Sequence, residues 1–542
     1  MGKYNKKSEA VKPTVTNCMG EMAYALTAKE ELVSTVLTTF LGDSYYEKET
    51  EIVKRITTKL AEVDPLFAAK LALYARQQAN MRSVTHLIAA TIAPRLTGLE
   101  WSGRFYNKIV VRPDDMSEIV SCYANMNKMD LKKIRRIPNS VKRGFKKALE
   151  RLDAYQIDKY KMNNRQVTMI DLVNLFHPKP TQKNNEAYKN LLTGKSLAGL
   201  YTTKVLEKEM SKAGQNKTSQ ADVDAAKSEA IADVLDNVAG MPIMNLLRNL
   251  RNIITMAPDK VDEACRQLRI REKILKSRLL PFRFATAYAE IEKMSNGTTT
   301  SIAFEKDGSD INTLKKKVLD AIEDALQIAC ENIPTLEGNV AILVDHSGSC
   351  RGDGGGSSRV SAFSKTTTAM IGNLFASMLA WKQDNVYIGL FGDKLINVPI
   401  NRDQKLLDFN KQSFDMGAKC GVATEQGIYN FFRLAINEKK KIDNVVVFSD
   451  CQIGSNGSTP WYGVSHNTRS PKFQQMITDF KKINPFCNII AVDLRQTKGN
   501  NVFHKSQRIM NIAGWSDKIF DVITSNAKGY DAIIKEIESI EI

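Results

Sequence analysis

The stretch Ala341-Ile342-Leu343-Val344-Asp345-His346-Ser347-Gly348-Ser349 decides the fold class of the C-terminal half of this chain. Its first four residues form a short apolar run, typical of a buried strand that ends where the polar residues begin. Asp345, Ser347 and Ser349 then place a carboxylate and two hydroxyls on alternate residues of one tight loop. Oxygen donors of this kind suit a hard divalent cation, and Mg²⁺ is the expected ion.

Two more oxygen donors follow at the ends of later segments. Thr424 lies in Gly-Val-Ala-Thr-Glu at 421–425, and Asp450 closes the run Val-Val-Val-Phe-Ser at 445–449. Ligands of open α/β sheets bind at the carboxyl ends of the strands, so Asp345 and Asp450 converge there if their strands are neighbours. Together these residues resemble a metal-ion-dependent adhesion site in a von Willebrand factor A domain. The ligands that this resemblance implies are Asp345, Ser347, Ser349, Thr424 and Asp450.

Other interpretations of the same loop are weaker. Asp-x-Ser-x-Ser alone is a common loop composition. A nucleophile elbow needs Gly-x-Ser-x-Gly between a strand and a helix, and neither Ser347 nor Ser349 has that frame. His346 is one residue away from each neighbouring polar position, so we interpret it as a variable loop residue. Three cysteines near the proposed ion are interpreted as neighbours and not as ligands, with a softer metal as the alternative: Cys350, Cys420 and Cys451.

The sequence on both sides of this loop predicts a doubly wound α/β sheet, because strand-like runs alternate with helical stretches. The expected strands are 340–345, 386–391, 444–449, 488–493 and 519–523, and the expected helices are 360–381, 426–437, 472–483 and 529–540. The glycine-rich segment 351–358 is not a P-loop, since no Gly-Lys-Ser/Thr follows it. We expect it to form a flexible lip beside the ion site.

The N-terminal half has a different character. From about residue 20 to 290 the apolar residues repeat with helical spacing, and prolines fall at the expected helix ends. Helix pairs of roughly 40 residues predict an α-solenoid of the HEAT type. A chain of 542 residues has room for two or more domains. We therefore expect an N-terminal tail at 1–20, a helical domain at 21–335 and a von Willebrand factor A-like domain at 336–542.

The positive charge is concentrated in the helical half. Residues 1–300 hold 49 Lys and Arg against 33 Asp and Glu, whereas residues 301–542 hold 28 against 27. The stretch 101–200 alone has 20 basic and 9 acidic residues. A basic run is usually a solvated helix face, but a surplus this one-sided favours a polyanionic partner, namely nucleic acid. The basic clusters are Lys132, Lys133, Arg135, Arg136, Lys142, Arg143, Lys146 and Lys147.

Cysteine usage and hydropathy indicate the compartment. The eight cysteines contain no Cys-x-x-Cys pair and are scattered, which is typical of reduced thiols. No run of eighteen apolar residues occurs, and the first residues lack the apolar stretch of a signal peptide. We therefore expect a soluble, cytoplasmic protein.

Several local strings, in their order along the chain, resemble the Ro autoantigen, or TROVE-module, family. They are Leu-Tyr-Ala-Arg at 73–76 with Arg-Ser at 82–83, Ile-Pro-Asn-Ser-Val-Lys at 137–142, Tyr-Gln-Ile-Asp-Lys-Tyr at 155–160, Asp-Leu-Val-Asn-Leu-Phe-His-Pro-Lys-Pro at 171–180, and Met-Pro-Ile-Met-Asn-Leu-Leu-Arg-Asn-Leu at 241–250. The resemblance spans nearly the whole chain, and the Gln-Ile-Asp-Lys-Tyr form is similar to bacterial or phage members.

The resemblance implies a closed helical ring that carries an A domain. Its basic central hole would take single-stranded 3′ ends of misfolded noncoding RNAs, and its outer surface would bind small structured Y RNAs. In that family a Lys, an Arg and a His contact the Y RNA. Lys159 or Lys161 matches the Lys and His177 the His, while Arg165 is a candidate for the Arg at a different spacing.

The sequence thus predicts a non-catalytic, monomeric RNA-binding scaffold for noncoding RNA quality control or degradation. The A domain would be a divalent-ion-dependent platform for an exoribonuclease or another protein. Two rival hypotheses remain. One is a metal-dependent phosphohydrolase that uses Asp345 and Asp450, although two-metal hydrolysis normally needs more carboxylates. The other is a protein-assembly platform whose basic surface is incidental.

Overall fold

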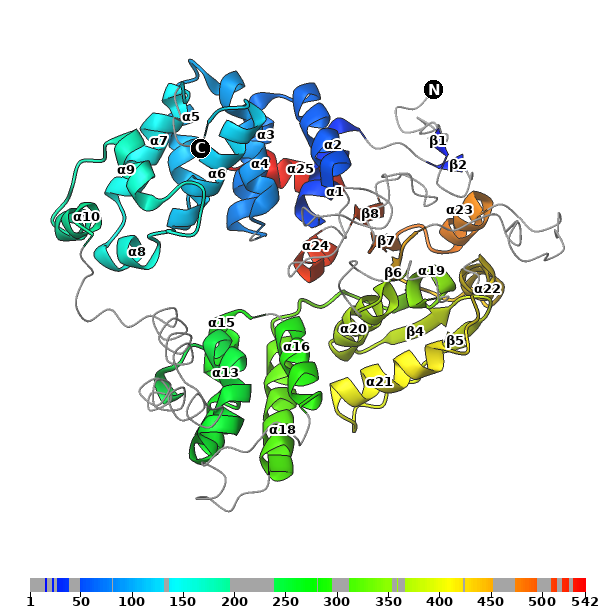
Figure 1. Cartoon of the computed structure of the whole chain (residues 1–542). Coiled ribbons are helices and arrows are strands. Elements are labelled where there is room, and N and C mark those ends of the chain that lie inside the picture. The colour runs from blue at the N-terminus through cyan, green and yellow to red at the C-terminus, as the bar shows by residue number, and fades with distance from the viewer. Residues whose placement is uncertain are drawn as a thin grey trace, which may run out of the picture.

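The computed structural model consists of helical layers that meet an α/β sheet domain (Figure 1). It describes residues 15–16, 22–23, 27–38, 49–79, 81–130, 136–194, 238–279, 281–294, 311–352, 358, 366–422, 425–451, 473–494, 508–513, 519–525 and 530–542.

The C-terminal domain is built on a six-stranded sheet with the order β5-β4-β3-β6-β7-β8. Neighbouring strands pair in parallel, except for β5, which is antiparallel to β4 at the edge. The strands are β3 Val340–Asp345, β4 Val386–Phe391, β5 Leu395–Asn397, β6 Asn444–Ser449, β7 Asn488–Asp493 and β8 Ile509–Ala513. The helices are α19 Gly348–Arg351, α20 Thr368–Trp381, α21 Leu406–Gly417, α22 Glu425–Asn437, α23 Phe473–Ile483, α24 Ile519–Ser525 and α25 Tyr530–Glu538.

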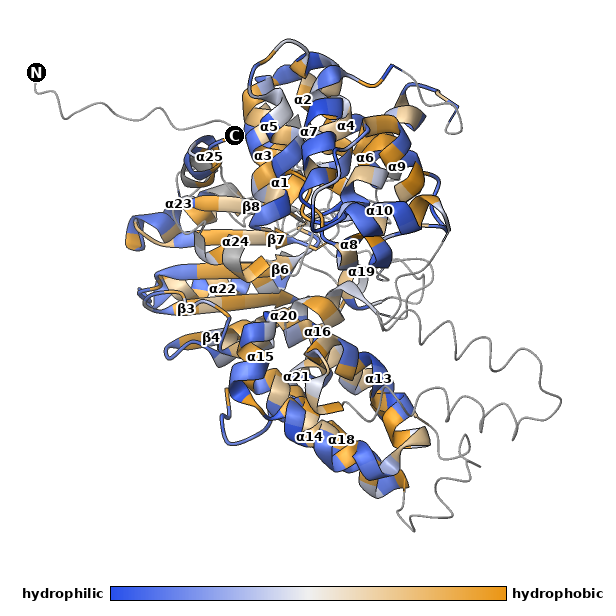
Figure 2. Ribbon diagram, turned by 90° about the vertical axis from the view of Figure 1, so that its left-hand side faces the viewer, coloured by the Kyte–Doolittle hydropathy of each residue, from blue (hydrophilic) through white to orange (hydrophobic). Residues whose placement is uncertain are grey.

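Both faces of this sheet are buried, as expected for a parallel sheet covered by helices. Successive side chains of a strand point to opposite faces, so β3 contributes to two cores. Ile342 and Val344 pack on the side of α20, whereas Leu343 packs on the side of α22 and α23. The strands lie between helices as largely apolar ribbons in Figure 2. The predicted doubly wound sheet is confirmed.

Four of the five expected strands have the predicted bounds, but the fifth was wrong. Residues 519–523 lie in α24, and the last strand of the sheet is β8. The run Ile-Phe-Asp-Val-Ile is short and apolar, so its periodicity does not distinguish a strand from a helix turn. Its buried side chains at 519, 520 and 523 have helical spacing. The short edge strand β5 and the helix α21 were not predicted.

The described residues of the N-terminal half are helical, as predicted, apart from a two-residue antiparallel ladder between β1 (Val15–Thr16) and β2 (Met22–Ala23). The first group of helices is α1 Ala28–Thr38, α2 Glu49–Glu62, α3 Pro65–Gln77, α4 Ser83–Ile92, α5 Ser102–Lys108, α6 Pro113–Met126, α7 Asn139–Glu150, α8 Ala154–Lys159, α9 Met169–Phe176 and α10 Asn185–Leu192. The second group is α13 Ile243–Met256, α14 Val261–Leu268, α15 Arg271–Ser277, α16 Pro281–Glu292 and α18 Ile311–Cys330.

The helices of the first group pack in pairs, and the pair α5 and α7 is the closest. At Gly144, an added Cβ would lie 2.3 Å from Tyr106 Cβ and 2.7 Å from the Gly103 carbonyl oxygen. A side chain at this position would therefore separate the two helices. Tyr106 packs edge-on against Phe145, and its hydroxyl donates a 2.7 Å hydrogen bond to the Ala89 carbonyl oxygen. The small residue in α7 thus sets the distance between these layers.

A buried ion pair joins α3 to α6. Arg76 and Asp115 are both buried, and Arg76 Nη2 lies 2.8 Å from Asp115 Oδ2. His86 Nε2 lies 2.9 Å from Asp115 Oδ1. The backbone amides of Val111 and Arg112 donate to Asp115 Oδ2, which caps the start of α6. This single carboxylate therefore fixes three helices and one helix start.

Both ends of the helical region meet the sheet domain, so the whole chain closes on itself (Figure 1). Helix α18 contacts α21, while α1 contacts β8 and α25 packs against α1 and α3. Four cations of the first group hold the end of α25 and the residues after it. Lys29 pairs with Glu538 at 2.7 Å, and Lys70 donates to the Glu538 carbonyl oxygen at 2.5 Å. Arg104 and Lys108 donate to the carbonyl oxygens of residues 542 and 541.

The cysteines and the hydropathy of the helices can be compared with the sequence-based expectations. The seven described cysteines are free thiols, six of them buried. In the part of the chain that the structure describes, no helix is both long and apolar enough to cross a membrane.

Candidate metal centre and basic surfaces

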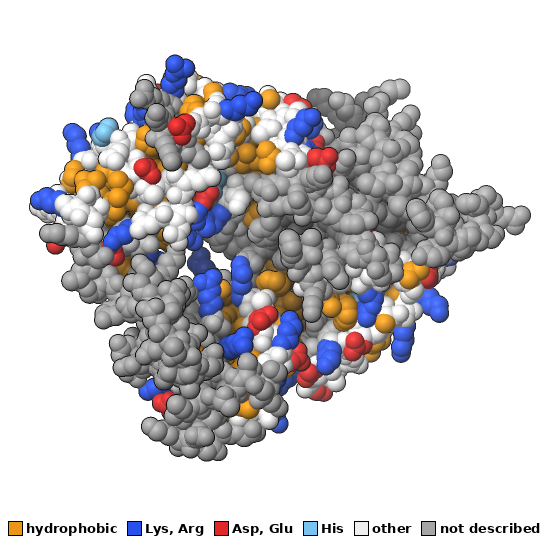
Figure 3. Space-filling model, viewed as in Figure 1, with side chains coloured by type: hydrophobic (Ala, Val, Ile, Leu, Met, Phe, Trp, Pro, Cys, Tyr) orange, Lys and Arg blue, Asp and Glu red, His pale blue; other side chains and the backbone are white. Residues whose placement is uncertain are grey.

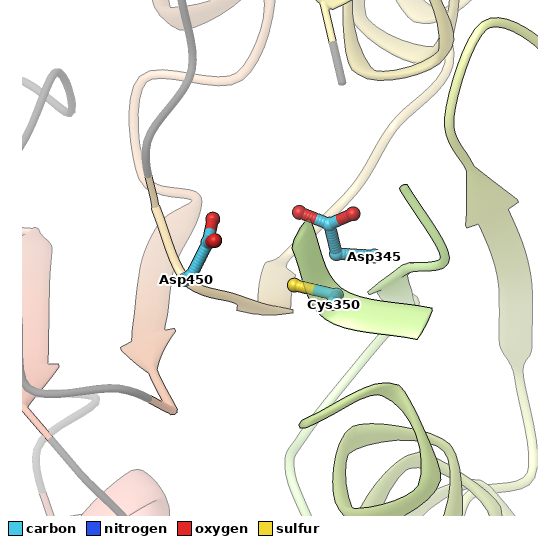
Figure 4. A group of neighbouring side chains, drawn as sticks. All are labelled: Asp345, Cys350 and Asp450. Carbon is cyan, nitrogen blue, oxygen red and sulfur yellow. The ribbon is translucent and has the colours of Figure 1, made fainter. Parts of the chain in front are cut away.

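The carboxyl edge of the sheet brings Asp345 and Asp450 together, as the sequence predicts. Strands β3 and β6 are parallel neighbours, so their C-terminal ends lie side by side. Asp345 ends β3 and Asp450 directly follows β6, and both side chains are buried. The two carboxylates face one site from two elements in Figure 4.

Asp345 is held by hydrogen bonds from two serine residues. The Ser347 backbone amide donates to Asp345 Oδ1 at 2.8 Å, and the Ser449 hydroxyl donates to Asp345 Oδ2 at 2.6 Å. The Ser347 and Ser349 hydroxyl oxygens lie 3.2 Å apart at the start of α19. The loop after β3 therefore holds the Asp345 carboxylate and the hydroxyls of Ser347 and Ser349 close to one another.

The sulfur of Cys350 completes the group. One ligand atom each of Asp345, Asp450 and Cys350 lies within 4.8 Å of the other two. Figure 4 shows the sulfur between the two carboxylates. From the sequence we expected Cys350 to be a neighbour of the ion and not a ligand. Burial raises the pKa of the nearby Cys420 thiol to about 12, so that sulfur stays protonated.

Burial raises the pKa of Asp345 above its usual range, and the nearby Asp450 carboxylate raises it further. The hydrogen bonds from Ser347 and Ser449 oppose this shift. Two buried carboxylates without a cation repel each other, and a divalent cation would remove that cost. The donor set of carboxylate and hydroxyl oxygens therefore fits a hard divalent ion.

Thr424 itself lies outside the described residues, but the segment before it runs beside the serine loop. The Gly348 amide donates to the Val422 carbonyl oxygen at 2.8 Å. The Val422 amide in turn donates to Asp393 Oδ2 at 3.0 Å. Val422, which precedes Thr424 by two residues, therefore lies beside the serine loop.

His346 is a core residue and not a variable loop position, so that expectation was wrong. Its side chain is buried, with Nε2 3.3 Å from Asn373 Oδ1 and Nδ1 3.0 Å from Arg351 Nη1. Burial and then the Arg351 charge lower the pKa of His346 to about 3, so the imidazole is neutral. A Cβ at Gly417 would lie 2.1 Å from His346 Nδ1. The ring therefore fills the space that this glycine leaves.

On α7 the predicted basic cluster forms one continuous face. Lys142, Arg143 and Lys147 are exposed and Lys146 is half-buried, whereas Val141, Phe145, Ala148 and Leu149 on the other side are buried. Residues three and four apart share a face of a helix, so the four cations point the same way. Within the described ranges none of the four forms an ion pair. Arg136 is exposed, and Lys132, Lys133 and Arg135 lie outside the described residues.

The residues that the family resemblance nominates lie around α8 and α9. Lys159 is exposed, with Nζ 5.2 Å from the centre of the Tyr155 ring and 5.7 Å from that of Tyr160. Lys161 pairs with Asp158 at 2.6 Å. His177 is exposed and ends α9 with a left-handed backbone at φ 45°. That conformation is rare for a residue other than glycine, and it turns the chain sharply after the helix.

Arg165 belongs to a different arrangement from the other nominated residues. Its guanidinium pairs with Glu118 and lies 3.6 Å from Asp114 Oδ2. Arg82 and Arg112 contact the same Asp114 oxygen at 2.8 and 3.1 Å. Neither Arg82 nor Arg112 was predicted as a site residue, because the two lie in separate connections and carry no shared motif.

Comparisons with known proteins agree with this architecture. The TROVE domain model matches residues 14–238. The chain is 22% identical over 339 residues to telomerase protein component 1 of Mus musculus, and this match covers 50% of the chain and 13% of the mouse protein. With the Rattus norvegicus protein of the same name it is 29% identical over 108 residues, which cover 20% and 4%. The chain thus spans a small part of the length of these curated relatives.

The fold has a match among solved structures. The crystal structure of the Ro (RSR) protein of Deinococcus radiodurans superposes with a TM-score of 0.60 at 15% sequence identity. The match covers 93% of this chain and 99% of that protein. It therefore includes both the helical half and the sheet domain. Residues 14–238 match the TROVE domain model, and the chain as a whole has the fold of this Ro (RSR) protein.

Proposed function

We propose that this protein is an RNA-binding scaffold that acts in noncoding RNA quality control or degradation. TROVE-family proteins bind RNA, and the helical half carries almost all of the chain's excess positive charge. The helices would bind single-stranded 3′ ends and small structured RNAs at different surfaces. The sheet domain would bind a protein partner through a divalent cation. The chain would act by binding and not by catalysis.

The observation that carries this proposal is the basic face of α7. Its four cations lie on one side of a helix whose other side is buried, so they cannot turn inwards. Ion pairs with described carboxylates do not neutralise them. Such a face attracts phosphates in a sequence-independent way, because each contact releases condensed counterions from the nucleic acid.

The distribution of charge on the surface also supports it. Figure 3 shows Lys and Arg side chains on both sides of the hollow between the first helical group and the helices α13–α18. Cations that face one another across a hollow would hold a single strand by its phosphates. The residues Lys159, Lys161 and His177 at α8 and α9 would contact a structured RNA on the outer surface.

The metal centre would serve the partner platform. Asp345, Ser347, Ser349 and Asp450 would hold the ion with Thr424, and Mg²⁺ is the proposed cation. When bound, the ion would supply an open coordination position for a carboxylate or phosphate oxygen of a partner. Ser449 would keep Asp345 in place through its hydroxyl.

The test replaces the four cations of α7 with glutamine: Lys142→Gln, Arg143→Gln, Lys146→Gln and Lys147→Gln. Affinity for single-stranded RNAs of several sequences is measured between about 50 and 200 mM salt, because phosphate contacts weaken strongly over that range. We expect a uniform loss of affinity. We also expect the slope of log K against log salt to flatten by up to about 3, if all four cations contact phosphates.

The matched control removes four exposed lysines of the sheet domain: Lys394, Lys411, Lys419 and Lys439. This variant has the same change in net charge but leaves α7 intact, so its affinity and salt slope should stay close to those of the parent. Equal affinities of the parent and the α7 variant would show that the basic face is only solvated. Cleavage of RNA by the purified parent in Mg²⁺ would favour the phosphohydrolase hypothesis instead.

A further inference from the structure

Three arginines from three separate connections converge on one buried carboxylate. Arg82 precedes α4, Arg112 precedes α6, and Arg165 lies between α8 and α9. Their guanidinium nitrogens lie 2.8, 3.1 and 3.6 Å from the same atom, Asp114 Oδ2. Three positively charged guanidinium groups, from distant parts of the sequence, thus lie around one carboxylate oxygen.

The carboxylate at the centre is structural. Asp114 is 3% exposed and sits in the first turn of α6, next to the buried Asp115. Asp115 pairs with the buried Arg76 at 2.8 Å, and its Oδ1 also lies 3.7 Å from Arg82 Nε. Burying Asp114 needs one counter-charge, and Arg82 at 2.8 Å supplies it. Arg112 and Arg165 therefore exceed what this carboxylate needs.

The three arginines remain accessible from solvent. Their side chains are 35%, 44% and 39% exposed for Arg82, Arg112 and Arg165, whereas Asp114 is 4% exposed as a side chain. Within the described residues, no hydrogen bond uses the Nη1 atom of Arg82 or Arg112. Arginine presents five donors in a planar fork, so the cluster has donors left for a second anion.

The surroundings add further positive potential. Arg112 stacks over the Tyr160 ring at 5.2 Å, and Lys159 lies 5.7 Å from the centre of the same ring. The cluster stands at the N-terminus of α6, a helix of 14 residues whose dipole favours an anion there. Among the described residues three carboxylates pair with these arginines and with Arg76, namely Asp114, Asp115 and Glu118, so the four arginines exceed the carboxylates by one positive charge.

We propose that Arg82, Arg112 and Arg165 form a binding site for one phosphate group of RNA, with Lys159 and Tyr160 at its edge. The inference rests on the proposed RNA-binding function. It adds a site for a single phosphate to the basic face of α7, which would contact several phosphates. The arginine N–H donors that Asp114 does not use suit a group with several oxygens and more than one charge. A terminal phosphate, which is a dianion, therefore fits this site better than an internal phosphodiester with a single charge.

The experiment uses one unstructured RNA oligonucleotide with three kinds of end: hydroxyl at both ends, a 5′-phosphate, or a 3′-phosphate. Each is titrated against the full chain, the Arg82→Gln/Arg112→Gln variant, and a control variant Arg143→Gln/Lys147→Gln with the same charge change. Charge-assisted hydrogen bonds contribute about 1.5–3 kcal/mol, so a terminal phosphate should raise the affinity of the parent about tenfold or more.

We expect the double arginine variant to bind all three oligonucleotides alike, while the control binds more weakly but keeps the preference for a phosphate end. A loss of affinity that is equal for all ends and larger than in the control would also support the site, with an internal phosphate as its ligand. A parent without an end preference, combined with equal losses in both variants, would overturn the inference. Binding of none of the oligonucleotides to the parent would overturn the proposed function as well.

Because Arg82 touches a buried carboxylate, the glutamine variant is checked by its thermal midpoint. If it unfolds early, Arg82→Lys/Arg112→Lys replaces it. Lysine keeps both charges but lacks the planar fork. We expect this variant to recover the affinity for the hydroxyl-ended RNA and not the preference for a phosphate end. Full recovery of that preference would show that charge alone accounts for the cluster, and would overturn the site.

Discussion

The Ser449 hydroxyl donates a 2.6 Å hydrogen bond to Asp345 Oδ2, and so joins the ends of two parallel strands. Because of this bond, the sheet and not a loop fixes the position of the Asp345 side chain. The same serine accepts a 2.9 Å hydrogen bond from the Cys451 amide, which directs the chain past Asp450. One hydroxyl thus orders both acidic residues of the candidate metal centre.

The first prediction is that Mg²⁺ stabilises the folded chain. An ion that binds only the folded form raises the thermal midpoint by mass action, and 100-fold excess over Kd corresponds to about 2.7 kcal/mol. Asp345→Ala should abolish this rise, and it should leave RNA affinity unchanged because the basic helices lie in the other half of the chain. Differential scanning calorimetry with Mg²⁺ and with chelator measures the effect.

The control for this prediction is Asp408→Ala, an exposed carboxylate on α21. Its response to Mg²⁺ should equal that of the parent. A parent midpoint that is the same in Mg²⁺ and chelator would show that the centre does not bind the ion. Loss of RNA binding in Asp345→Ala would contradict the division between the two halves.

The second prediction separates the outer surface from the site for single strands. Replacing Lys161 and His177 with alanine should weaken binding of a Y-like RNA stem more than binding of a single-stranded 3′ tail, because both residues lie around α8 and α9. Filter binding with the two RNAs measures the ratio of affinities. The α7 glutamine variant is the comparison. Equal losses for both RNAs would mean that no separate outer site exists there.

The third prediction concerns the helix crossing at Gly144. In Gly144→Ala the new methyl group would overlap Tyr106 Cβ and the Gly103 backbone, so α5 and α7 must move apart. Overpacking of this kind costs about 1–3 kcal/mol, occasionally more. Urea unfolding followed by circular dichroism should give that decrease in stability. Gly194→Ala, at a glycine whose surroundings are open but whose φ is 71°, tests backbone strain alone. A stable Gly144→Ala variant would contradict the close packing.

The fourth prediction is a loss of stability in mild acid. Burial lowers the pKa of His86, so below the ordinary imidazole pKa of about 6.5 the unfolded chain binds a proton that the folded chain does not. Stability is therefore complete above pH 6.5 or so and falls as the pH decreases, by about 1.4 kcal/mol per pH unit for one proton. Denaturant unfolding at several pH values should show His86→Gln to be less sensitive than the parent.

The control is His177→Gln, at an exposed histidine, which should keep the pH dependence of the parent. Asp115 adds a second loss at lower pH. Burial alone would raise its pKa, but the His86 hydrogen bond and the Arg76 charge outweigh burial and lower it. Ionised Asp115 therefore stabilises the folded chain at pH values above the usual carboxylate pKa, and this stabilisation is lost as the pH falls below it. Identical pH profiles for the parent and His86→Gln would contradict this account.

The sheet domain was predictable because its signals are local. The strands β3, β4, β6 and β7 are uninterrupted apolar runs, and Asp345 and Asp450 stand at the strand ends where parallel neighbours must bring them together. Strand β8 was missed because Ile-Met-Asn-Ile-Ala contains a polar residue, while the more apolar run in α24 has helical burial. Tertiary packing decided between these two segments.

The long-range contacts could not be read from the sequence. His346 is buried because Gly417, 71 positions later in the chain, leaves space for its ring. The cluster of Arg82, Arg112 and Arg165 exists only because three connections meet at Asp114. Sequence spacing carries no information on such meetings. The α7 face, in contrast, followed from a single helix and its period of 3.6 residues.

The contacts between α25 and the first helices have a consequence for the order of folding. Lys29 and Glu538 are 509 positions apart, and Lys70 bonds a carbonyl oxygen 468 positions away. Contacts of such separation form late, because the chain entropy of closing the loop must be overcome before they stabilise anything. During synthesis α1 and α3 emerge long before α25, so the surface that they bury against α25 stays open until residues 530–538 follow. These contacts between α25 and the first helices should therefore form late in folding.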